Sequence, residues 1–577
     1  MVLEVPENNM NIQEKIKNWI KETLNIEEEF SLEYPSQMSH GDYFTNVAMI
    51  LAKKNIINPI ELAKEFTQKL NDNKIDEILK IEVAGPGFIN FSLVSEVFSN
   101  IVSESIKLEE NVGQNRKLSN QKFLVEYTDP NPFKEFHIGH LMSNAIGEAI
   151  SRIIATEGAE VKRLSYGGDV GLHVAKAMFA VLQKKDEIEN IKTKDKKEQL
   201  EFWGSSYVLG SKEYTENEES KKEIDNLNKV IFDKSDKEIN ELYSWGRSVS
   251  IDFFQEIFAR LGTKFDKNFW ESEVVEDALK SVKIGLEKKI LEQSDGAVVF
   301  KGEEYGLHTR VFVNSKGVPT YEAKELGLGI KKYEMYSFDK SVVITGNEQN
   351  DYFKVVLKAT ELIKPEVSGK TVHIGHGMLR FASGKMSSRT GNIITAVSLM
   401  SDIKDMVLGK MKEREMDESK KDLIAEQVMM GALKYSILKQ TPGKDIIFDF
   451  EKSVSFEGDS GPYLQYATVR ANSILKKSDD IVSLSSKIPD NWTTTNLERM
   501  IERFENVVSR AGDEYAPHYI VTYLVQLASE FNSFYAQNKI IDSEDKTSPY
   551  KLAITQSFVN VMKAGLNLLA IPVPEEM

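Results

Sequence analysis

Residues 123–158 read FLVEYTDPNPFKEFHIGHLMSNAIGEAISRIIATEG. We call them the organising stretch, and the helix that they contain the organising helix, because the rest of the chain is interpreted from them. The stretch opens with Phe123–Tyr127, a short apolar run typical of a buried strand. Asp129-Pro130-Asn131-Pro132 then breaks the run and predicts a tight loop. Between Ile138 and Ile154 the apolar residues recur at three- and four-residue steps, and Gly158 stands where a helix C-cap belongs. The sequence therefore predicts a strand, a loop and an amphipathic helix.

Two histidines lie at the start of this predicted helix, in His137-Ile138-Gly139-His140. A helix N-terminus offers unpaired N–H groups and the positive end of the helix dipole, which suit a phosphate. Gly139 removes a side chain that would block close approach. For an isolated HxGH tetrapeptide, however, a helix start with two exposed histidines is the simpler interpretation.

A second HxGH copy shows why context is needed. His373-Ile374-Gly375-His376 follows Thr371-Val372, and no amphipathic helix comes after it. We interpret this copy as a chance match at the end of a strand.

Composition limits the class of protein. A length of 577 residues predicts three or four domains, and 41% hydrophobic with 28% charged residues is ordinary for a globular protein. The sequence lacks cysteine, which excludes disulfides and thiolate zinc sites, and its eight histidines show no other metal-ligand spacing. We expect no protein-held metal, no membrane span and a cytoplasmic location. The net charge of −16 argues against nonspecific nucleic-acid binding, but not against a specific RNA partner.

The chain before the organising stretch predicts a compact α+β unit that ends near Leu108. Residues 11–30 and 59–70 have helical patterns, and strands are expected at 78–83 and 88–93 around the turn Gly85-Pro86-Gly87. The polar run 109–122 is typical of a linker.

After the organising helix, Glu160–Tyr166 predicts a second strand and so a parallel strand–helix–strand unit. Gly167–Gly171 follows at the strand's carboxyl end, where open α/β sheets bind ligands. Residues 183–237 are densely charged with mixed signs, which favours a solvated helical insertion over a nucleic-acid arm. We expect insertions to continue to about residue 304, with the sheet resuming at Thr309–Val313.

A glycine-bracketed cationic loop follows at residues 384–391. Lys385, Met386, Ser387, Ser388 and Arg389 stand between the two glycines. Such a loop suits a polyphosphate, although a plain surface turn is an equal alternative when the loop is taken alone. From residue 396 onward the pattern is almost wholly helical, and we expect most aromatic residues there to be core.

HxGH at a helix start and KMSSR later in the same α/β region together resemble the class I aminoacyl-tRNA synthetases. Within that class the chain is similar to the arginyl-tRNA synthetases over nearly its whole length. The similarity rests on Glu126–His140, on Gly41–Ala48 and Gly85–Asn90 near the N-terminus, and on Gly461–Arg470 and Gly565–Leu569.

The resemblance implies a multidomain fold. We expect an α+β N-terminal domain that contacts tRNA (1–112), a Rossmann-like α/β catalytic domain with a parallel sheet and insertions near 183–304 (113–395), a helical connecting region (396–457) and an all-α anticodon-binding domain (458–577).

The resemblance also implies the reaction, in which ATP activates L-arginine as an adenylate and the arginyl group then passes to tRNA. His137, His140, Lys385 and Arg389 are the implied catalytic residues. The implied ATP-binding residues are His137, Gly139, His140, Lys385, Met386, Ser387 and Ser388. Mg²⁺ is expected to enter with ATP, held largely by the phosphates.

Selection of arginine needs acceptors, because a guanidinium has five N–H donors and stays charged. The resemblance implies that Glu126, Asn131, His137, Tyr321, Glu325 and Gln349 bind arginine. The family commonly has Asp where this chain has Glu325, so the longer side chain leaves its pairing distance open. The register of Glu348-Gln349 is open as well, and a helix-surface charge is the alternative for each acid.

The resemblance further implies a monomer that contacts the elbow, the acceptor end and the anticodon of arginine tRNA. Two alternatives stay open. One is another class I synthetase or a small nucleotidyltransferase, although the latter leaves KMSSR and the helical third unexplained. The other is a regulator that holds tRNA without chemistry, which predicts that the catalytic residues are eroded.

Overall fold

The computed structural model describes residues 11–382, 395–413, 415–478 and 483–577. This part of the chain divides into two compact units. The first contains the described residues up to Asn115 together with Tyr466–Val508 and Tyr523–Gly565. The second contains Arg116–Gln465, Ser509–Thr522 and Leu566–Met577.

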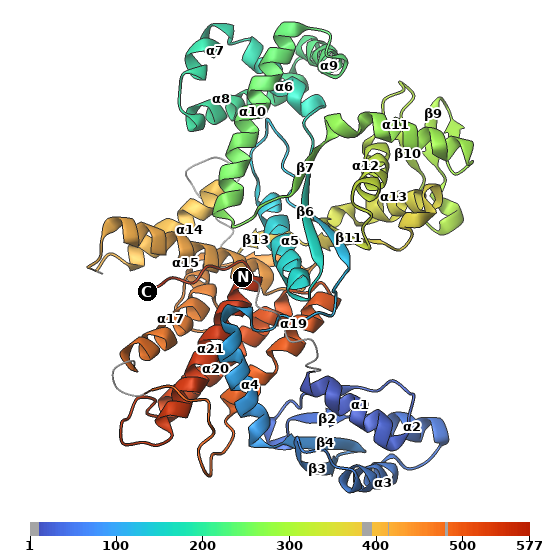
Figure 1. Ribbon diagram of the computed structural model, residues 1–577. Coiled ribbons are helices and arrows are strands. Elements are labelled where there is room, and N and C mark those ends of the chain that lie inside the picture. Colours follow the sequence, from blue (N-terminus) through green and yellow to red (C-terminus); the bar gives the residue numbers. More distant parts are fainter. Residues whose placement is uncertain (1–10, 383–394, 414, 479–482) are drawn as a thin grey trace. The chain divides into compact units, whose positions relative to one another are not determined.

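A five-stranded parallel sheet belongs to the second unit and has the strand order β12-β11-β5-β6-β7. Its strands β6, β7 and β11 are labelled in Figure 1. The strands are β5 (Lys122–Glu126), β6 (Glu160–Gly167), β7 (Lys267–Trp270), β11 (Lys340–Gly346) and β12 (Thr371–His376). The chain winds outward from β5 in one direction through β6 and β7, and in the other through β11 and β12. This is the Rossmann arrangement, so the strand order reverses between β5 and β11. The predicted Rossmann-like parallel sheet is confirmed.

Apolar residues on both faces explain why β5 is the central strand. Phe123, Leu124 and Val125 are all nearly inaccessible to solvent, as expected for a parallel strand covered by helices. The predicted helix is α5 (Ile138–Thr156), and it lies close to the strand that precedes it. A Cβ at Gly147 of α5 would come within 2.2 Å of the Tyr127 ring, so this contact requires glycine.

Helices α11 (Glu271–Glu287) and α12 (Tyr321–Tyr336) share an apolar cluster with β5, β6 and β7. Helix α13 (Asn350–Ile363) lies on β12, where the Phe353 ring stacks on His373. Helix α12 packs closely on α11, since a Cβ at Gly327 would meet the backbone of Ala278 at 2.5 Å. This close packing fixes the position of the charged residues that α12 carries.

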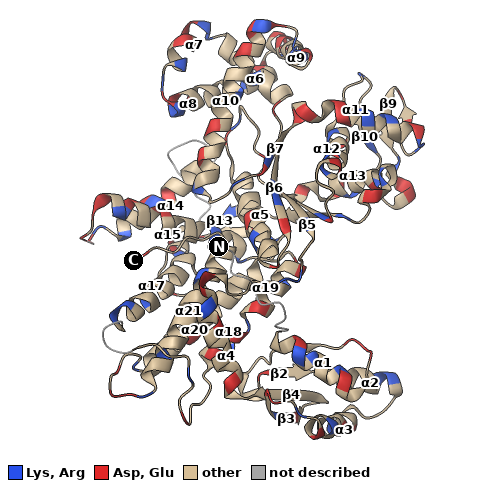
Figure 2. Cartoon of the chain, in the orientation of Figure 1, with Lys and Arg blue, Asp and Glu red and all other residues tan. Residues whose placement is uncertain are grey.

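The charged region after β6 is helical, as predicted. It contains α6 (Leu172–Leu182), α7 (Lys185–Lys192), α8 (Lys196–Glu216), α9 (Glu218–Asp233) and α10 (Lys237–Arg260). Acidic and basic residues are mixed on α7, α8 and α9 (Figure 2). A local apolar core that includes Phe202, Trp203 and Ile224 holds these helices together.

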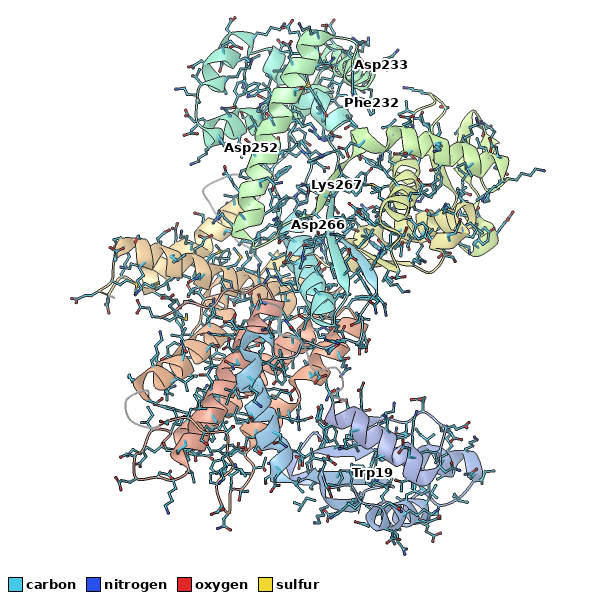
Figure 3. The ribbon with its side chains drawn as sticks, in the orientation of Figure 1. Trp19, Phe232, Asp233, Asp252, Asp266 and Lys267 are labelled. Carbon is cyan, nitrogen blue, oxygen red and sulfur yellow. The ribbon has the colours of Figure 1, made fainter. Side chains whose placement is uncertain are left out.

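The expectation that the sheet resumes at Thr309–Val313 is wrong. Strand β10 (Arg310–Val313) belongs to a separate antiparallel sheet with β9 (Ala297–Phe300) and β8 (Glu292–Ser294). The fifth strand of the main sheet is instead β7, inside the range expected to be an insertion. Asp266 and Lys267, labelled in Figure 3, lie where β7 begins, and the Asp266 carboxylate accepts the Arg163 N–H of β6 at 2.8 Å. Strand β7 has only four residues, and Lys267 and Asn268 among them are polar. The sequence therefore shows no apolar run of strand length there.

The first unit begins with an antiparallel sheet of order β1-β2-β4-β3, as expected for an α+β domain. Its elements are α1 (Ile12–Leu24), β1 (Leu32–Glu33), β2 (Tyr43–Thr45), α2 (Val47–Asn55), α3 (Pro59–Asp72), β3 (Ile78–Ala84), β4 (Phe88–Leu93) and α4 (Ser95–Leu108). The buried Asp42 carboxylate joins this sheet to α18 (Asn496–Glu502), since it accepts from Arg499 Nε at 2.7 Å.

The elements described after residue 395 are helices, apart from the short strand β14 (Ile446–Phe448), which pairs with β13 (Leu379–Phe381). Its helices are α14 (Ala396–Lys410), α15 (Glu418–Leu438), α16 (Phe450–Ser453), α17 (Gly461–Ser478), α18, α19 (Phe504–Asp513), α20 (His518–Gln537) and α21 (Ser548–Leu568). The predicted all-α C-terminal part is therefore confirmed, with α18 and α19 divided at Arg503.

Candidate active site

A cavity of about 840 Å³ opens at the carboxyl ends of β5 and β11, where the strand order reverses. Such a switch point is where open α/β sheets bind ligands. All the sequence-predicted site residues that the structure describes line this one cavity. They are Glu126, Asn131, His137, Gly139, His140, Tyr321, Glu325 and Gln349.

The two histidines cap helix α5. His137 Nδ1 accepts the Gly139 N–H at 3.1 Å, and His140 Nδ1 accepts the His137 N–H at 3.2 Å. The two rings stack with their centroids 3.5 Å apart. Because each Nδ1 accepts a backbone hydrogen bond, each neutral ring carries its proton on Nε2.

Burial keeps both imidazoles neutral. It is the largest cause that lowers the pKa of His137, and the nearby Lys134 lowers it further. The pKa of His140 falls well below its usual range, again through burial and then through His137. Gly139 has a local role too, since a Cβ there would lie 2.9 Å from the His137 ring.

Three separate elements contribute carboxylates to the same cavity. Glu126 ends β5 and is 2% exposed, Asp129 follows in the loop, and Glu325 projects from α12. Burial, followed by the charge of Glu126, raises the pKa of Glu325 to about 7. The same two causes, in the same order, raise the pKa of Asp129 well above its usual range. A pocket with this excess of acid favours a cationic ligand.

Two lysines of α12 pair with acids at the cavity wall. Lys332 Nζ lies 3.0 Å from Glu126 Oε2, and Lys324 Nζ lies 2.6 Å from Glu271 Oε2. Within the described residues, no lysine or arginine forms an ion pair with Glu325 or Asp129. These two carboxylates therefore add negative charge to the cavity that no ion pair within the described residues compensates.

The loop after β5 is held by the glycine-rich segment after β6. Asn131 Oδ1 accepts the Gly168 N–H at 2.7 Å, and Asp129 Oδ1 accepts the Tyr166 N–H at 2.7 Å. A Cβ at Gly167 would come within 2.6 Å of the Pro130 carbonyl oxygen, so the two segments approach as closely as backbone allows.

Asp169 anchors the glycine-rich segment Gly167–Gly171 to two helices. Its fully buried carboxylate accepts hydrogen bonds from Tyr243 at 3.1 Å, from Arg247 at 3.0 Å and from both the N–H and the hydroxyl of Ser272 at 2.9 and 2.7 Å. Because these partners come from α10 and α11, one side chain links the segment to two helices.

Tyr321 and Gln349 are cavity-lining residues that are also accessible to solvent. The Tyr321 side chain is mostly exposed, and its carbonyl oxygen accepts the Tyr352 hydroxyl at 3.0 Å. Gln349 ends a single 3₁₀ turn, Asn347–Gln349, directly after β11. Glu348, its exposed neighbour, also lines the cavity.

The second HxGH copy is strand β12, and the next element described is the short strand β13 rather than a helix, as expected. Even so, its last histidine reaches the site. His376 is 6% exposed, lines the cavity and lowers the pKa of both His137 and His140 as a minor cause. Sequence reasoning missed His376 because it searched for a helix, whereas the end of a parallel strand is itself a ligand position.

Sequence reasoning also missed Asp129, Glu271 and Lys332. The sequence places Asp129 in a strand-breaking loop and in the Glu126–His140 signature but gives it no binding role, and the pairing of lysines with cavity acids has no motif. The sequence does contain one indication of the buried lysines. Lys324, Leu328 and Lys332 recur every four residues, so they share one face of the helix. In the structure Leu328 is fully buried, and both lysines are buried with it.

The predicted phosphate loop, Lys385, Met386, Ser387, Ser388 and Arg389, lies outside the described residues. Across the ranges that are described, no cluster of three or more His, Asp or Glu side chains suits a metal ion. Over those same ranges, no helix combines the length and the apolar character of a membrane span.

Three protein families match the chain in consecutive segments. The catalytic domain of class I tRNA synthetases (R) matches residues 102–450. The arginyl tRNA synthetase N-terminal domain matches residues 10–93, and the DALR anticodon binding domain matches residues 464–577.

Full-length relatives agree with these matches. The chain is 31% identical over 554 residues to an arginine–tRNA ligase of Limosilactobacillus reuteri, covering 95% of this chain and 96% of that protein. It is 29% identical over 572 residues to an arginine–tRNA ligase of Treponema denticola, covering 96% and 95%.

Solved structures share the fold. The arginyl-tRNA synthetase of Thermus thermophilus aligns with a TM-score of 0.82 at 24% identity, covering 98% of this chain and all of that one. The Plasmodium falciparum arginyl-tRNA synthetase aligns with a TM-score of 0.81 at 19% identity, covering 99% and 100%.

Proposed function

The chain belongs to the class I arginyl-tRNA synthetases, and we propose that the cavity at the β5–β11 switch point is where it brings arginine and ATP together. It ligates arginine to tRNA in two steps. The arginine carboxylate attacks the α-phosphate of ATP, giving arginyl-adenylate and pyrophosphate, and the arginyl group then passes to the terminal adenosine of the tRNA with release of AMP. One observation carries the proposal: a helix terminus suited to phosphate and carboxylates suited to a guanidinium line the same cavity.

His137 and His140 are proposed to serve the phosphates. With both Nδ1 atoms used in capping, each neutral ring offers its Nε2–H as a donor to a phosphate oxygen. The start of α5 adds the positive end of its dipole. Together they stabilise the charge that grows on the α-phosphate and on the leaving pyrophosphate. Lys385 and Arg389 remain predicted to close over the pyrophosphate, with Gly139, Met386, Ser387 and Ser388 as further ATP contacts.

The acidic wall is proposed to bind arginine. Glu126 and Glu325 are proposed to face the guanidinium, and Tyr321 and Gln349 are proposed as further arginine contacts from the same cavity lining. Asn131 is proposed for the α-amino group. Its Oδ1 already accepts the Gly168 N–H, but an amide oxygen has a second lone pair that an ammonium can use.

Mg²⁺ enters the proposal as a companion of ATP, because it binds mainly phosphate and water oxygens. Glu348 is proposed to offer the ion a carboxylate oxygen, because it is an exposed acid in the cavity wall and lies near enough to influence the pKa of His137. The ion neutralises phosphate charge when bound.

The tRNA contacts are proposed by region. The N-terminal domain is assigned to the elbow, the catalytic unit to the acceptor end and the DALR domain to the anticodon, on the support of the three family matches. A monomeric, cytoplasmic enzyme completes the proposal.

The test is arginine-dependent exchange of pyrophosphate into ATP, with and without tRNA, and with lysine and glutamate as control amino acids. Exchange should require arginine, and His140→Ala should slow it by roughly a hundredfold or more, as loss of a charge-stabilising donor does. His308→Ala, an exposed histidine of the same unit, is the matched control. Unchanged exchange in His140→Ala would refute the assignment, and tRNA binding without any exchange would favour the regulator.

A further inference from the structure

Helix α12 carries charged residues both in the cavity lining and behind it, and Glu322 and Glu325 are the ones that line the cavity. Lys324 and Lys332 lie behind the wall, where each meets a carboxylate from another element. Lys332 is the more deeply buried of the two, with 3% of its side chain exposed against 10% for Lys324. Its partner Glu126 is the acid at the end of the central strand.

The burial of Glu126 makes a partner necessary. With 2% of its side chain exposed, Glu126 sits where an unpaired carboxylate is strongly disfavoured. Lys332 supplies the compensating charge at 3.0 Å. Burial alone would lower the pKa of Lys332, but Glu126 and then Glu325 outweigh it, so the pKa is raised and the side chain stays a cation.

The ion pair with Lys332 uses one carboxylate oxygen of Glu126 and leaves the second oxygen able to accept another hydrogen bond. Lys332 donates to Oε2 from behind the wall. Oε1 has no hydrogen-bonding partner within the described part of the chain, and Glu126 lines the cavity. The ion pair therefore fixes the carboxylate in an orientation with one acceptor to spare.

We propose that Lys332 is a positioning residue for arginine selection, which holds the Glu126 carboxylate in place so that its second oxygen can accept from the guanidinium. The inference rests on the arginine pocket proposed above. Lys332 itself does not touch the substrate, since it does not line the cavity.

The neighbouring charges support this role. Glu325 and Asp129 are the other acids near Glu126, and neither has an ion pair within the described residues. Glu271 is already paired with Lys324. Without Lys332, Glu126, Glu325 and Asp129 would repel one another with no cation paired to any of them, and the Glu126 carboxylate would lose its fixed orientation.

The test compares four proteins in pyrophosphate exchange: wild type, Lys332→Met, Glu126→Gln and the double variant. Lys332→Met should raise the KM for arginine by at least about tenfold, the loss typical of truncating one member of a buried charge pair, and leave the KM for ATP within about twofold of wild type. Lys331→Met is the control, because it removes an adjacent lysine of the same helix whose ion pair with Asp277 points elsewhere.

The double variant separates positioning from a general structural effect. If Lys332 acts through Glu126, adding Lys332→Met to Glu126→Gln should change the arginine KM by less than about twofold. The double variant also removes both buried charges, so it keeps the test valid even if Lys332→Met alone does not fold.

The outcomes distinguish the two proposals. An equal rise in arginine KM from Lys332→Met in both backgrounds, or parallel rises for arginine and ATP, would overturn the positioning role. An arginine KM that Glu126→Gln leaves unchanged would instead refute the proposed pocket.

Discussion

Arginine binding should weaken as the pH falls from 8 to 6, and Glu325 is the expected cause. Burial and the charge of Glu126 raise the pKa of this carboxyl to about 7, so it titrates inside that window. A guanidinium binds the ionised carboxylate, whereas a protonated carboxyl offers a competing donor. The sign follows directly, because lowering the pH removes the form that binds.

The size of the effect comes from the pKa. With a value of about 7, about nine-tenths of the Glu325 side chains are ionised at pH 8 and about one-tenth at pH 6. The apparent dissociation constant scales inversely with the competent fraction, so it should rise about tenfold, or about 1.4 kcal/mol. Near pH 7, arginine binding should release about half a proton from this group.

Isothermal titration calorimetry with L-arginine measures both quantities, when runs at each pH use buffers of different ionisation enthalpy. Glu325→Gln should bind arginine weakly and with a flattened pH dependence, while the exposed Glu334→Gln on the same helix should keep the wild-type slope. A wild-type affinity that is constant from pH 6 to 8 would refute the reasoning. A slope that survives in Glu325→Gln would assign the titration to another acid, of which Asp129 is the nearest candidate.

Two further predictions concern stability and are read from the melting temperature. Asp169→Asn should lower the free energy of unfolding by about 3 kcal/mol, because it leaves the Arg247 guanidinium without its buried partner, and an unchanged melting temperature would contradict the anchoring role. Gly147→Ala should destabilise by about 1–3 kcal/mol through its clash with Tyr127, whereas Gly204→Ala, with no atom within 4 Å of the added Cβ, should stabilise helix α8 by about 0.5–1 kcal/mol. Equal effects of the two alanines would show that packing does not decide the outcome.

The sequence predicted the elements with strong periodicity and missed those with none. Helix α5 and strand β5 stand where the pattern of apolar residues placed them, because burial on one face or on both leaves a regular signal. Strand β7 has four residues and lies at a sheet edge, so no run of apolar residues marks it. Strand β10 has an apolar run, but only tertiary pairing shows that it joins β9 rather than the main sheet.

The site residues also divide into those that a local sequence motif marks and those that only the tertiary structure brings to the site. His137, His140 and Glu126 could be named because a motif holds them at fixed spacing from one another. His376 and Lys332 reach the site from β12 and α12, and their approach depends on the strand order and on helix packing. Such contacts between distant segments are invisible to local patterns.

The position of β5 at the middle of the sheet also shapes how the chain is made. One edge of β5 pairs with β6 soon after synthesis, but the other waits for β11, and 217 residues separate Lys122 from Asp339, to which it is hydrogen bonded. At ribosomal rates of roughly 5–20 residues per second, that interval lasts roughly 10–45 s. For that time the nascent chain has an apolar strand with an open edge, the kind of surface that associates with other unfinished chains. The speed of translation between Lys122 and Asp339 therefore sets how long the growing chain is prone to aggregation before β11 pairs with its central strand.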